Sequence, residues 1–248
     1  MIYQRDYKAV SWCVKTTDPH YCVRMSDDVW TRLADLDSTS LADASPELAV
    51  LPTDLRPVGR ARRLVGRAVT ADAQGDLMSV IAGLAVSGPG DVLVVAVGDD
   101  ERAVAGELFA TEAVRRGLAG LVIDGRCRDS AIVAELDLPV FARGVAPNAY
   151  PAVKVPRIQE PIMIGSVVIN PGDVIVGDDD GLVAGSVAAV TAAVEKAEAI
   201  QARERRLRSA IEAGSSLFDA LNVDEHVAAL QAGQPSSLAF RELGEPLS

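Results

Sequence analysis

The stretch DVLVVAVGDDERAVAGELFATEAVRRGLAGLVID, residues 91–124, decides the fold class of this chain. An apolar run at 91–97 is followed by a helical pattern at roughly 104–116, and a second apolar run at 119–124 comes after Gly117. This order predicts a β-α-β unit, whose two strands are parallel and whose crossover is right-handed. We therefore expect an α/β protein with a parallel core.

The composition suits such a core. Of the 248 residues, 49% are hydrophobic and only 4% are aromatic, so Ala, Val, Leu and Ile must fill the interior. Small aliphatic side chains favour a parallel sheet that is covered by helices on both faces. The length is enough for one large domain or two small ones.

The charge and the rare residue types exclude several classes of protein. With 24 basic and 35 acidic residues the net charge is −11, which repels phosphate backbones, so we expect no nucleic-acid ligand. The cysteines are Cys13, Cys22 and Cys127, an odd number without a CxxC pair, and the only histidines are His20 and His226. A disulfide framework, a zinc cluster or a Ser–His–Asp triad is therefore not indicated.

The chain also lacks the marks of a membrane or exported protein. Its first residues, MIYQRDYKAV, do not form the apolar stretch of a signal peptide. No apolar run reaches the length of a membrane span, so we expect no membrane partner and a cytoplasmic location.

We expect three regions along the chain. Residues 1–25 hold three of the four tyrosines and look like an N-terminal arm that packs on the domain or on a neighbouring subunit. Residues 26–215 form the main domain, which begins with a helix capped by Ser26 and ends with a long helix capped by Ser186. Residues 216–248 hold a C-terminal helix and a tail.

The rest of the main domain alternates strands, helices and turns. The patterns predict a second helix near Ser38 or Ser40, a loop at 45–60, strands at 63–71 and 138–143, and helices at 76–86 and 129–137. The segment at 162–185 alternates apolar runs with the turns NPGD and DDDG, so we expect β-hairpins there.

Polar side chains follow both strands of the β-α-β unit. Glu107 lies near the start of the helix, and Arg128 and Asp129 come directly after the second strand. Ligands of parallel sheets bind beyond the carboxyl ends of the strands, which meet at one edge. We therefore expect these three side chains and the first N–H groups of the helix to line one cleft.

This set of groups favours one kind of chemistry. A helix N-terminus and Arg128 both bind anions, and Asp129 and Glu107 offer the hard oxygen ligands that Mg²⁺ or Mn²⁺ prefers. A 2-oxo acid needs both, because its carboxylate and keto oxygens chelate a metal and a nearby cation stabilises its enolate. The alternative is that the Arg-Asp pair is only a surface ion pair.

The stretch GELFATEAVRRGLAGLVIDGRCRD, residues 106–129, resembles the signature of the RraA-like proteins. These include the class II pyruvate aldolases that cleave 4-hydroxy-4-methyl-2-oxoglutarate and 4-carboxy-4-hydroxy-2-oxoadipate. The signature is an acidic residue, twenty intervening residues and an Arg-Asp pair, matched here by Glu107, Arg128 and Asp129. The segments GRAVTA, LPVFARG and PGDVIVGDDDGLV also match, and the resemblance covers roughly residues 26–215.

The resemblance implies a fold and an assembly. We expect an α/β/β/α sandwich of the swivelling-domain type, with a parallel β-α-β core and a long C-terminal helix. Such proteins form homotrimers, sometimes doubled to hexamers, and their active site lies between subunits. The implied ligand is a small 2-oxo acid.

The resemblance also implies roles for single residues. Asp129 would bind Mg²⁺ or Mn²⁺ directly, Glu107 would hold metal-bound water, and Arg128 would contact the keto or enolate oxygen. Glu204, from the C-terminal helix of a neighbouring subunit, would also orient metal-bound water. The pyruvyl carboxylate would be bound by the backbone amides of Gly106, Glu107, Leu108 and Phe109.

The reaction implied is retro-aldol cleavage of a 4-hydroxy-2-oxo diacid to pyruvate, with oxaloacetate decarboxylation as a second activity through the same enolate. Two alternatives stay open: a non-catalytic regulator of ribonuclease E, and a biosynthetic lyase or decarboxylase with a different 2-oxo acid. The chain departs from the family in its N-terminal arm, in Leu77, where many relatives carry a polar residue, and in Arg126, a second positive charge near the site.

Overall fold

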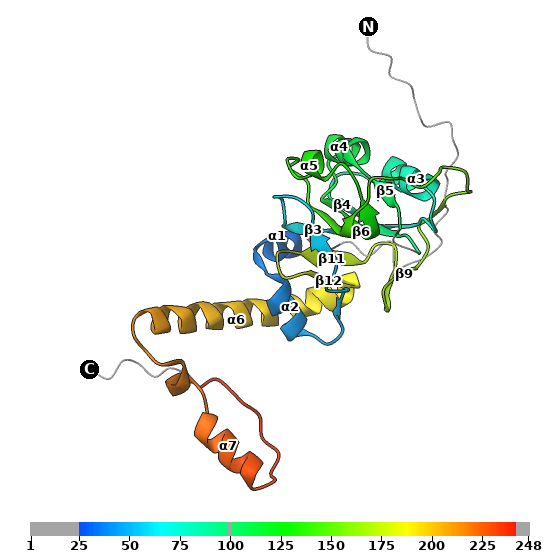
Figure 1. Cartoon of the computed structure of the whole chain (residues 1–248). Coiled ribbons are helices and arrows are strands. Elements are labelled where there is room, and N and C mark those ends of the chain that lie inside the picture. Colours follow the sequence, from blue (N-terminus) through cyan, green and yellow to red (C-terminus); the bar gives the residue numbers. More distant parts are fainter. Residues whose placement is uncertain (1–24, 99–100, 242–248) are drawn as a thin grey trace. The chain divides into compact units, whose positions relative to one another are not determined.

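The computed structural model describes residues 25–98 and 101–241 (Figure 1). The chain divides into two compact units, Met1–Ala197 and Glu198–Ser248. Apart from Met25, the predicted N-terminal arm at 1–25 lies outside the described residues. Within the described residues no helix combines the length and the hydropathy that crossing a membrane requires.

The first unit is built on a mixed sheet of ten strands. Its main path runs β1-β12-β11-β3-β4-β6-β7-β2, with β5 paired to β6 and β8 paired to β3. The strands are β1 (Ala49–Val50), β2 (Arg56–Pro57), β3 (Leu64–Asp72), β4 (Asp91–Ala96), β5 (Ala103–Ala105), β6 (Gly120–Cys127), β7 (Val140–Val145), β8 (Arg157–Ile158), β11 (Val174–Gly177) and β12 (Leu182–Gly185).

The predicted β-α-β unit is confirmed. Strands β4 and β6 are parallel neighbours, in register from Val92 opposite Gly120 to Ala96 opposite Asp124. The connecting helix α4 (Glu107–Arg116) ends at Gly117, whose φ of +74° places it in the left-handed region that favours glycine. The helix begins a turn later than the pattern suggested, because β5 takes the preceding residues into the sheet.

Both faces of the parallel strands are buried, which explains their continuous apolar sequence. Successive side chains of β4 point to opposite faces, so Leu93 and Val95 pack in one core cluster and Val92 and Val94 in another. The first cluster includes buried residues of α3 (Met78–Val86) and α4, which lie on the same side of the sheet as α5 (Ser130–Val133) (Figure 1).

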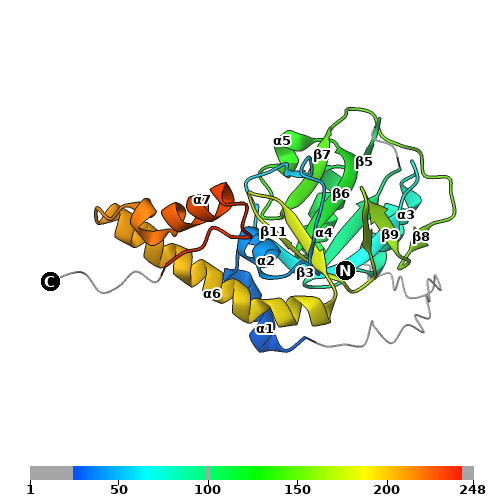
Figure 2. The ribbon, with the colours of Figure 1, turned by 90° about the horizontal axis from the view of Figure 1, so that it is seen from below.

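The second cluster is closed by hairpins, as the sequence predicted for 162–185. Strands β9 (Ile162–Ile164) and β10 (Val167–Ile169) form a separate antiparallel pair, and β11 pairs antiparallel with β12. Ile162 and Ile164 of β9 pack in this second cluster, on the face of the sheet opposite to α3, and Figure 2 shows β9 close to β8. The expected fold class, α/β with a parallel core, is therefore confirmed.

Helix caps lie close to where the sequence placed them. In α1 (Asp27–Asp35), Ser26 Oγ accepts a hydrogen bond from the backbone N–H of Val29 at 3.5 Å. Helix α2 (Ser38–Ala44) does begin at Ser38, but its cap is Asp37, which accepts from the N–H of Ser40 at 2.7 Å. The cap of the long helix α6 (Val187–Glu212) is Ser186, as expected.

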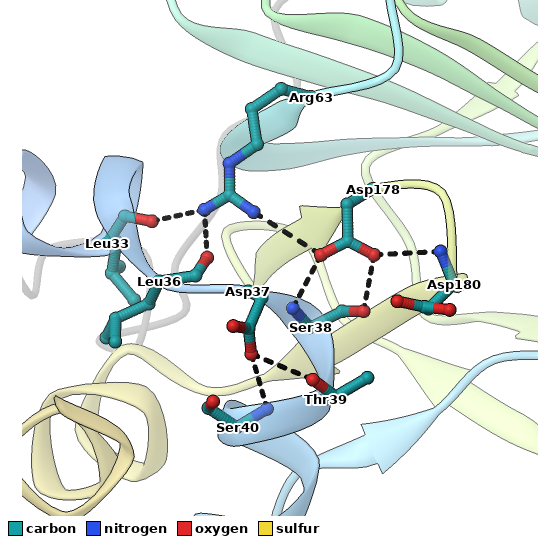
Figure 3. A network of polar contacts seen from close by, with 9 residues as sticks. All are labelled: Leu33, Leu36, Asp37, Ser38, Thr39, Ser40, Arg63, Asp178 and Asp180. Carbon is teal, nitrogen blue, oxygen red and sulfur yellow. Dashed lines mark hydrogen bonds and ion pairs between the residues drawn. The ribbon is translucent and has the colours of Figure 1, made fainter. Parts of the chain in front are cut away.

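A network centred on Arg63 fastens the first two helices to the sheet (Figure 3). The Arg63 guanidinium donates to the carbonyl oxygens of Leu33 and Leu36 at the C-terminal end of α1, where the Leu33 carbonyl also accepts from the N–H of Leu36. The guanidinium also pairs with Asp178, on the turn after β11, at 3.6 Å. Asp178 in turn accepts from the N–H of Ser38 at 2.7 Å and from its hydroxyl at 2.6 Å.

The second unit contains the C-terminal part of α6, a 3-10 turn at Leu217–Ala220 and α7 (Val223–Gln231). The tail predicted after α7 is partly ordered: Phe240 pairs with Leu221, and its ring lies 4.9 Å from the guanidinium of Arg203. His226, which the sequence placed in a C-terminal helix, lies in α7 and contacts Ser236 at 2.9 Å.

Candidate active site

The Arg-Asp pair lies directly beside the N-terminus of α4. Strand β5 runs parallel to the end of β6, and the backbone N–H of Arg128 donates to the carbonyl of Ala105 at 2.9 Å. Gly106 follows β5 and is the N-cap residue of α4. The pairing of β5 with β6 therefore brings Gly106 and Glu107 against Arg128 and Asp129, 22 residues later in the chain.

Asp129 is the centre of the polar contacts at this point. Its Oδ2 accepts a hydrogen bond from the backbone N–H of Glu107 at 3.2 Å and lies 3.3 Å from Nε of Arg128. The carboxylate thus stands at the positive end of the α4 dipole, where a negative charge is stabilised. The structure brings together Glu107, Arg128 and Asp129, which the sequence predicted to share one site.

Two backbone features make this close approach possible. A Cβ atom at Gly106 would lie 2.4 Å from Asp129 Oδ2 and 2.8 Å from Arg128 Cγ, so any other residue there would displace these two side chains. Asp129 has φ +56° and ψ 34°, a left-handed conformation that is uncommon outside glycine and that aspartate tolerates better than most residues. Such conformations concentrate at functional sites.

A cavity of about 70 Å³ opens beside the pair. Arg128, Asp129 and Gly106 line its polar side. Its other walls are apolar and include Leu77, Val104, Leu108, Phe109 and Ala149. The side chain of Glu107 is not part of this lining, and the residue contributes to the site through its backbone N–H, which donates to Asp129.

The donors present fit a hard divalent ion that keeps most of its ligands as water and substrate oxygens. Among the described residues none donates a hydrogen bond to Asp129 Oδ1, and the Asp129 side chain is about one-third exposed. Mg²⁺ is commonly held by one or two carboxylates in this way. The described part of the chain has no group of three or more His, Cys, Asp and Glu side chains that could hold a metal alone.

Glu204, predicted to act from a neighbouring subunit, lies on an exposed part of α6 in the second unit. That role stays a prediction. Arg126, the second positive charge near the site, is half-buried within β6 and does not line the cavity.

The sequence did not predict how the loop at 149–154, whose Ala149 lines the apolar side of the cavity, is held in place. Asp76 is 1% exposed and accepts hydrogen bonds from the backbone N–H groups of Met78 at 2.8 Å, Val153 at 2.8 Å and Lys154 at 3.2 Å. Burial by itself would raise the pKa of Asp76, but these N–H groups outweigh it and hold the pKa below its ordinary value. A signal existed, since aspartate just before a helix commonly caps it.

A second, larger cleft of about 630 Å³ lies at the ends of the same strands. It is lined by Asp54, Asp124 and Arg143 among others, and Arg143 pairs with both carboxylates, at 2.6 Å for Asp124. The two ion pairs raise the pKa of Arg143 despite its burial. Because these charges already satisfy one another, the cavity beside Arg128 is the better candidate for a catalytic site.

The fold and the site define a class: an α/β protein that presents a helix N-terminus and an Arg-Asp pair at the carboxyl ends of parallel strands. The chain belongs to the RraA-like family, since the family model described as Aldolase/RraA matches residues 35–184.

Among the relatives, some are named as aldolases and others as ribonuclease inhibitors. The chain is 37% identical over 157 residues to a Halalkalibacterium halodurans protein named "Putative 4-hydroxy-4-methyl-2-oxoglutarate aldolase", a match that covers 62% of this chain and 75% of the relative. A Pseudomonas syringae pv. tomato structure of an uncharacterized protein superposes with TM-score 0.72 at 28% identity, covering 82% and 97% of the two chains. Streptomyces coelicolor RraAS2, described as an unusual member of the RNase ES inhibitor RraA family, superposes with TM-score 0.65 at 27% identity, covering 75% and 98%.

Proposed function

We propose that this chain is a class II carbon–carbon lyase that releases pyruvate from a 4-hydroxy-2-oxo acid, with Mg²⁺ or Mn²⁺ as cofactor. The observation that carries this proposal is the meeting of Arg128, Asp129 and the N-terminus of α4 around one cavity. The aldolase names of relatives support the reaction type.

The carboxylate of the substrate binds at the start of α4. The first N–H groups of a helix have no carbonyl partner within it. The N–H of Glu107 is taken by Asp129, which leaves those of Leu108 and Phe109 for an anion. The helix dipole adds to their attraction. The absence of a side chain at Gly106 lets Asp129 and Arg128 lie close to the start of the helix.

Arg128 acts on the keto oxygen. As the C3–C4 bond breaks, the C4 hydroxyl gives up its proton and the electron pair of the bond passes through C3 to that oxygen. The guanidinium stabilises the negative charge that develops there. The resulting enolate takes a proton at C3 and leaves as pyruvate, while C4 leaves as a carbonyl compound.

Asp129 and Glu107 would hold the divalent ion, Asp129 directly and Glu107 through water. When bound, the ion supplies a Lewis acid that adds to the charge stabilisation by Arg128. Oxaloacetate decarboxylation forms the same enolate, so we propose it as a second activity.

The test is pyruvate release from 4-hydroxy-2-oxo acids and from oxaloacetate, with Mg²⁺ or Mn²⁺ and with a chelator. We expect Arg128→Ala to lower kcat/KM by about two to three orders of magnitude, because a preorganised donor to the developing oxyanion is lost. Asp129→Asn should weaken the dependence on metal as well. Arg60→Ala removes an exposed ion pair with Glu135 and serves as the control. Full activity in the Arg128 and Asp129 variants would refute the proposal.

The likeness to RraAS2 favours a second candidate, regulation of a ribonuclease by direct binding. An acidic chain could cover a basic RNA-binding segment. Capture of the protein by a ribonuclease E scaffold domain, undiminished in Arg128→Ala, would support this candidate, whereas the lyase proposal predicts no capture.

A further inference from the structure

The cavity beside Arg128 is lined by segments that lie far apart in the sequence. Arg128 and Asp129 follow β6, whereas Leu77 lies just before α3. Ala149 belongs to the loop after β7, of which residues 149–154 are here called the 149–154 loop. The shape of the cavity therefore depends on what holds this loop against α3 and β5.

Side-chain packing contributes little to holding the 149–154 loop. Tyr150 packs against the first core cluster, but the side chains from 151 to 155 are exposed, and that of Val153 is 80% exposed. Segments with few buried apolar contacts open at a small cost in free energy. The hydrogen bonds of this loop are therefore the contacts that decide its position.

One end of the loop is bound to β5. The N–H of Ala103 donates to the carbonyl of Asn148 at 2.9 Å, and the N–H of Tyr150 donates to the carbonyl of Ala103 at 3.1 Å. Strand β5 in turn pairs with the end of β6, directly before Arg128. Backbone hydrogen bonds thus fix this end of the loop relative to the Arg-Asp pair.

The other end of the loop is bound to α3 through Asp76. Oδ2 of Asp76 accepts hydrogen bonds from the N–H of Val153 at 2.8 Å and from that of Lys154 at 3.2 Å. Its Oδ1 accepts from the first N–H of α3 at 2.8 Å. The N–H of Leu77 adds a bond to the carbonyl of Pro151 at 2.8 Å. A single carboxylate, 1% exposed, thus joins the start of α3 to the loop.

We propose that Asp76 is a positioning residue of the candidate active site, which fixes the 149–154 loop against α3 and so sets the width of the cavity beside Arg128. The proposal rests on the proposed function, in which the pyruvyl group of the substrate binds in this cavity. Asp76 does not line the cavity and acts through Leu77 and Ala149, which do. Without its carboxylate, buried N–H groups lose their partner, the loop moves away from α3 and the cavity no longer fits the ligand.

The first experiment measures ligand binding, which needs no turnover. Isothermal titration with oxalate, an analogue of the pyruvate enolate, is carried out in Mg²⁺ on the unaltered chain and on Asp76→Asn. An amide has only one accepting oxygen, so N–H groups of the loop or of α3 lose their bond. We expect the Kd of oxalate to rise by about tenfold, because the wall of the cavity is displaced. Titration with Mn²⁺ alone should give the same Kd for both chains, since Asp129 stays in place.

Asp91→Asn is the matched control. Asp91 is half-buried, accepts a hydrogen bond from the N–H of Gly88 at 2.8 Å and lies at the amino end of β4, away from the site. A loss of stability alone lowers the number of binding sites per chain and leaves the Kd unchanged, so both values are recorded. An unchanged oxalate Kd in folded Asp76→Asn would overturn the proposal. An equal rise in Asp91→Asn, or failure of oxalate to bind the unaltered chain at millimolar concentration, would overturn it as well.

Val153→Pro tests the same contact from the side of the loop. Proline has no N–H, so this variant removes the bond of 2.8 Å to Asp76 and leaves the carboxylate in place. We expect a smaller rise in the oxalate Kd than in Asp76→Asn. Should Asp76→Asn fail to fold, an unchanged Kd in Val153→Pro would overturn the proposal.

Turnover separates this inference from the function on which it rests. Pyruvate release by the unaltered chain, together with an unchanged oxalate Kd in Asp76→Asn, contradicts the positioning role and leaves the lyase in place. A raised oxalate Kd in Asp76→Asn, without pyruvate release from any 4-hydroxy-2-oxo acid by the unaltered chain, supports the positioning role and contradicts the lyase.

Discussion

Gly106 shows how the site depends on a single missing side chain. The position lies between β5 and α4, where the chain passes the Asp129 carboxylate and the Arg128 side chain at contact distance. Its backbone is extended, so glycine is needed for space and not for its conformational freedom. A residue of any other type would displace the Asp129 and Arg128 side chains of the candidate site.

We therefore predict that Gly106→Ala lowers kcat/KM by about tenfold to a hundredfold, because displacement of a catalytic group by about 1 Å has effects of this size. Pyruvate release measures the effect, and the thermal midpoint checks that the fold persists. Gly88→Ala is the control, since a Cβ there would meet nothing closer than 3.8 Å. Equal activity of the two variants would contradict this account of Gly106.

The buried carboxylate of Asp76 makes a prediction about pH. Its pKa in the folded protein lies below the ordinary pKa of an aspartate, so its contribution to stability is present above that ordinary pKa and is lost as the pH falls through the folded pKa. Asp76→Asn should cost about 1–3 kcal/mol near neutral pH, because an amide cannot accept all three N–H bonds. Urea unfolding from pH 7 to pH 3 should show a smaller loss for the variant than for the unaltered chain.

At the scale of elements, the polar network centred on Arg63 joins α1 and α2 to the sheet. Helices α1 and α2 are short, and Arg63 joins the end of the first and, through Asp178, the start of the second to the β11–β12 turn (Figure 3). The guanidinium is partly buried, which lowers the pKa of Arg63. Groups held in this way are costly to leave unpaired.

Neighbouring aspartates on the turn provide a matched pair of substitutions. Asp178 is 18% exposed and accepts three hydrogen bonds, whereas Asp179 is 65% exposed and makes an ion pair with Arg62. Asp178→Ala should lower the free energy of unfolding by about 1–3 kcal/mol. Asp179→Ala should lower it by about 0–1 kcal/mol, as usual for surface ion pairs. Equal losses of unfolding free energy in the two variants, measured by denaturant unfolding, would contradict this role of the Arg63 network.

For the whole molecule, the second unit raises the question of assembly. Helix α7 buries none of its residues, and Phe218 and Leu230 are 72% and 56% exposed. A segment of this size buries too little apolar surface to be stable by itself. These side chains are therefore candidates for contacts in the assembly that the family resemblance implies.

We predict a homotrimer or a hexamer. Light scattering after size exclusion should give about 78 kDa or about 156 kDa, three or six times the chain mass of 26.0 kDa. Phe218→Ser should shift the mass toward the single chain if the second unit takes part. A mass near 26.0 kDa for the unaltered protein would contradict the prediction.

The sequence by itself determined the features that local patterns encode. Apolar runs and a helical period were enough for the β-α-β unit, the hairpins and the caps at Ser26 and Ser186, because each depends on neighbours along the chain. Parallel pairing of β4 with β6 was also enough to predict that Glu107 lies near Arg128 and Asp129, although the contact itself depends on β5, which the sequence did not predict.

The tertiary structure alone decided the features that depend on distant segments. Strands β1 and β2 lie within the stretch read as a loop, and they exist because β12 and β7 offer them free edges. The apolar wall at Leu77 depends on a buried carboxylate that binds a loop 77 residues away. Such contacts leave no periodic trace in the sequence, since their free energy comes from burial and hydrogen bonding between parts that meet only after folding.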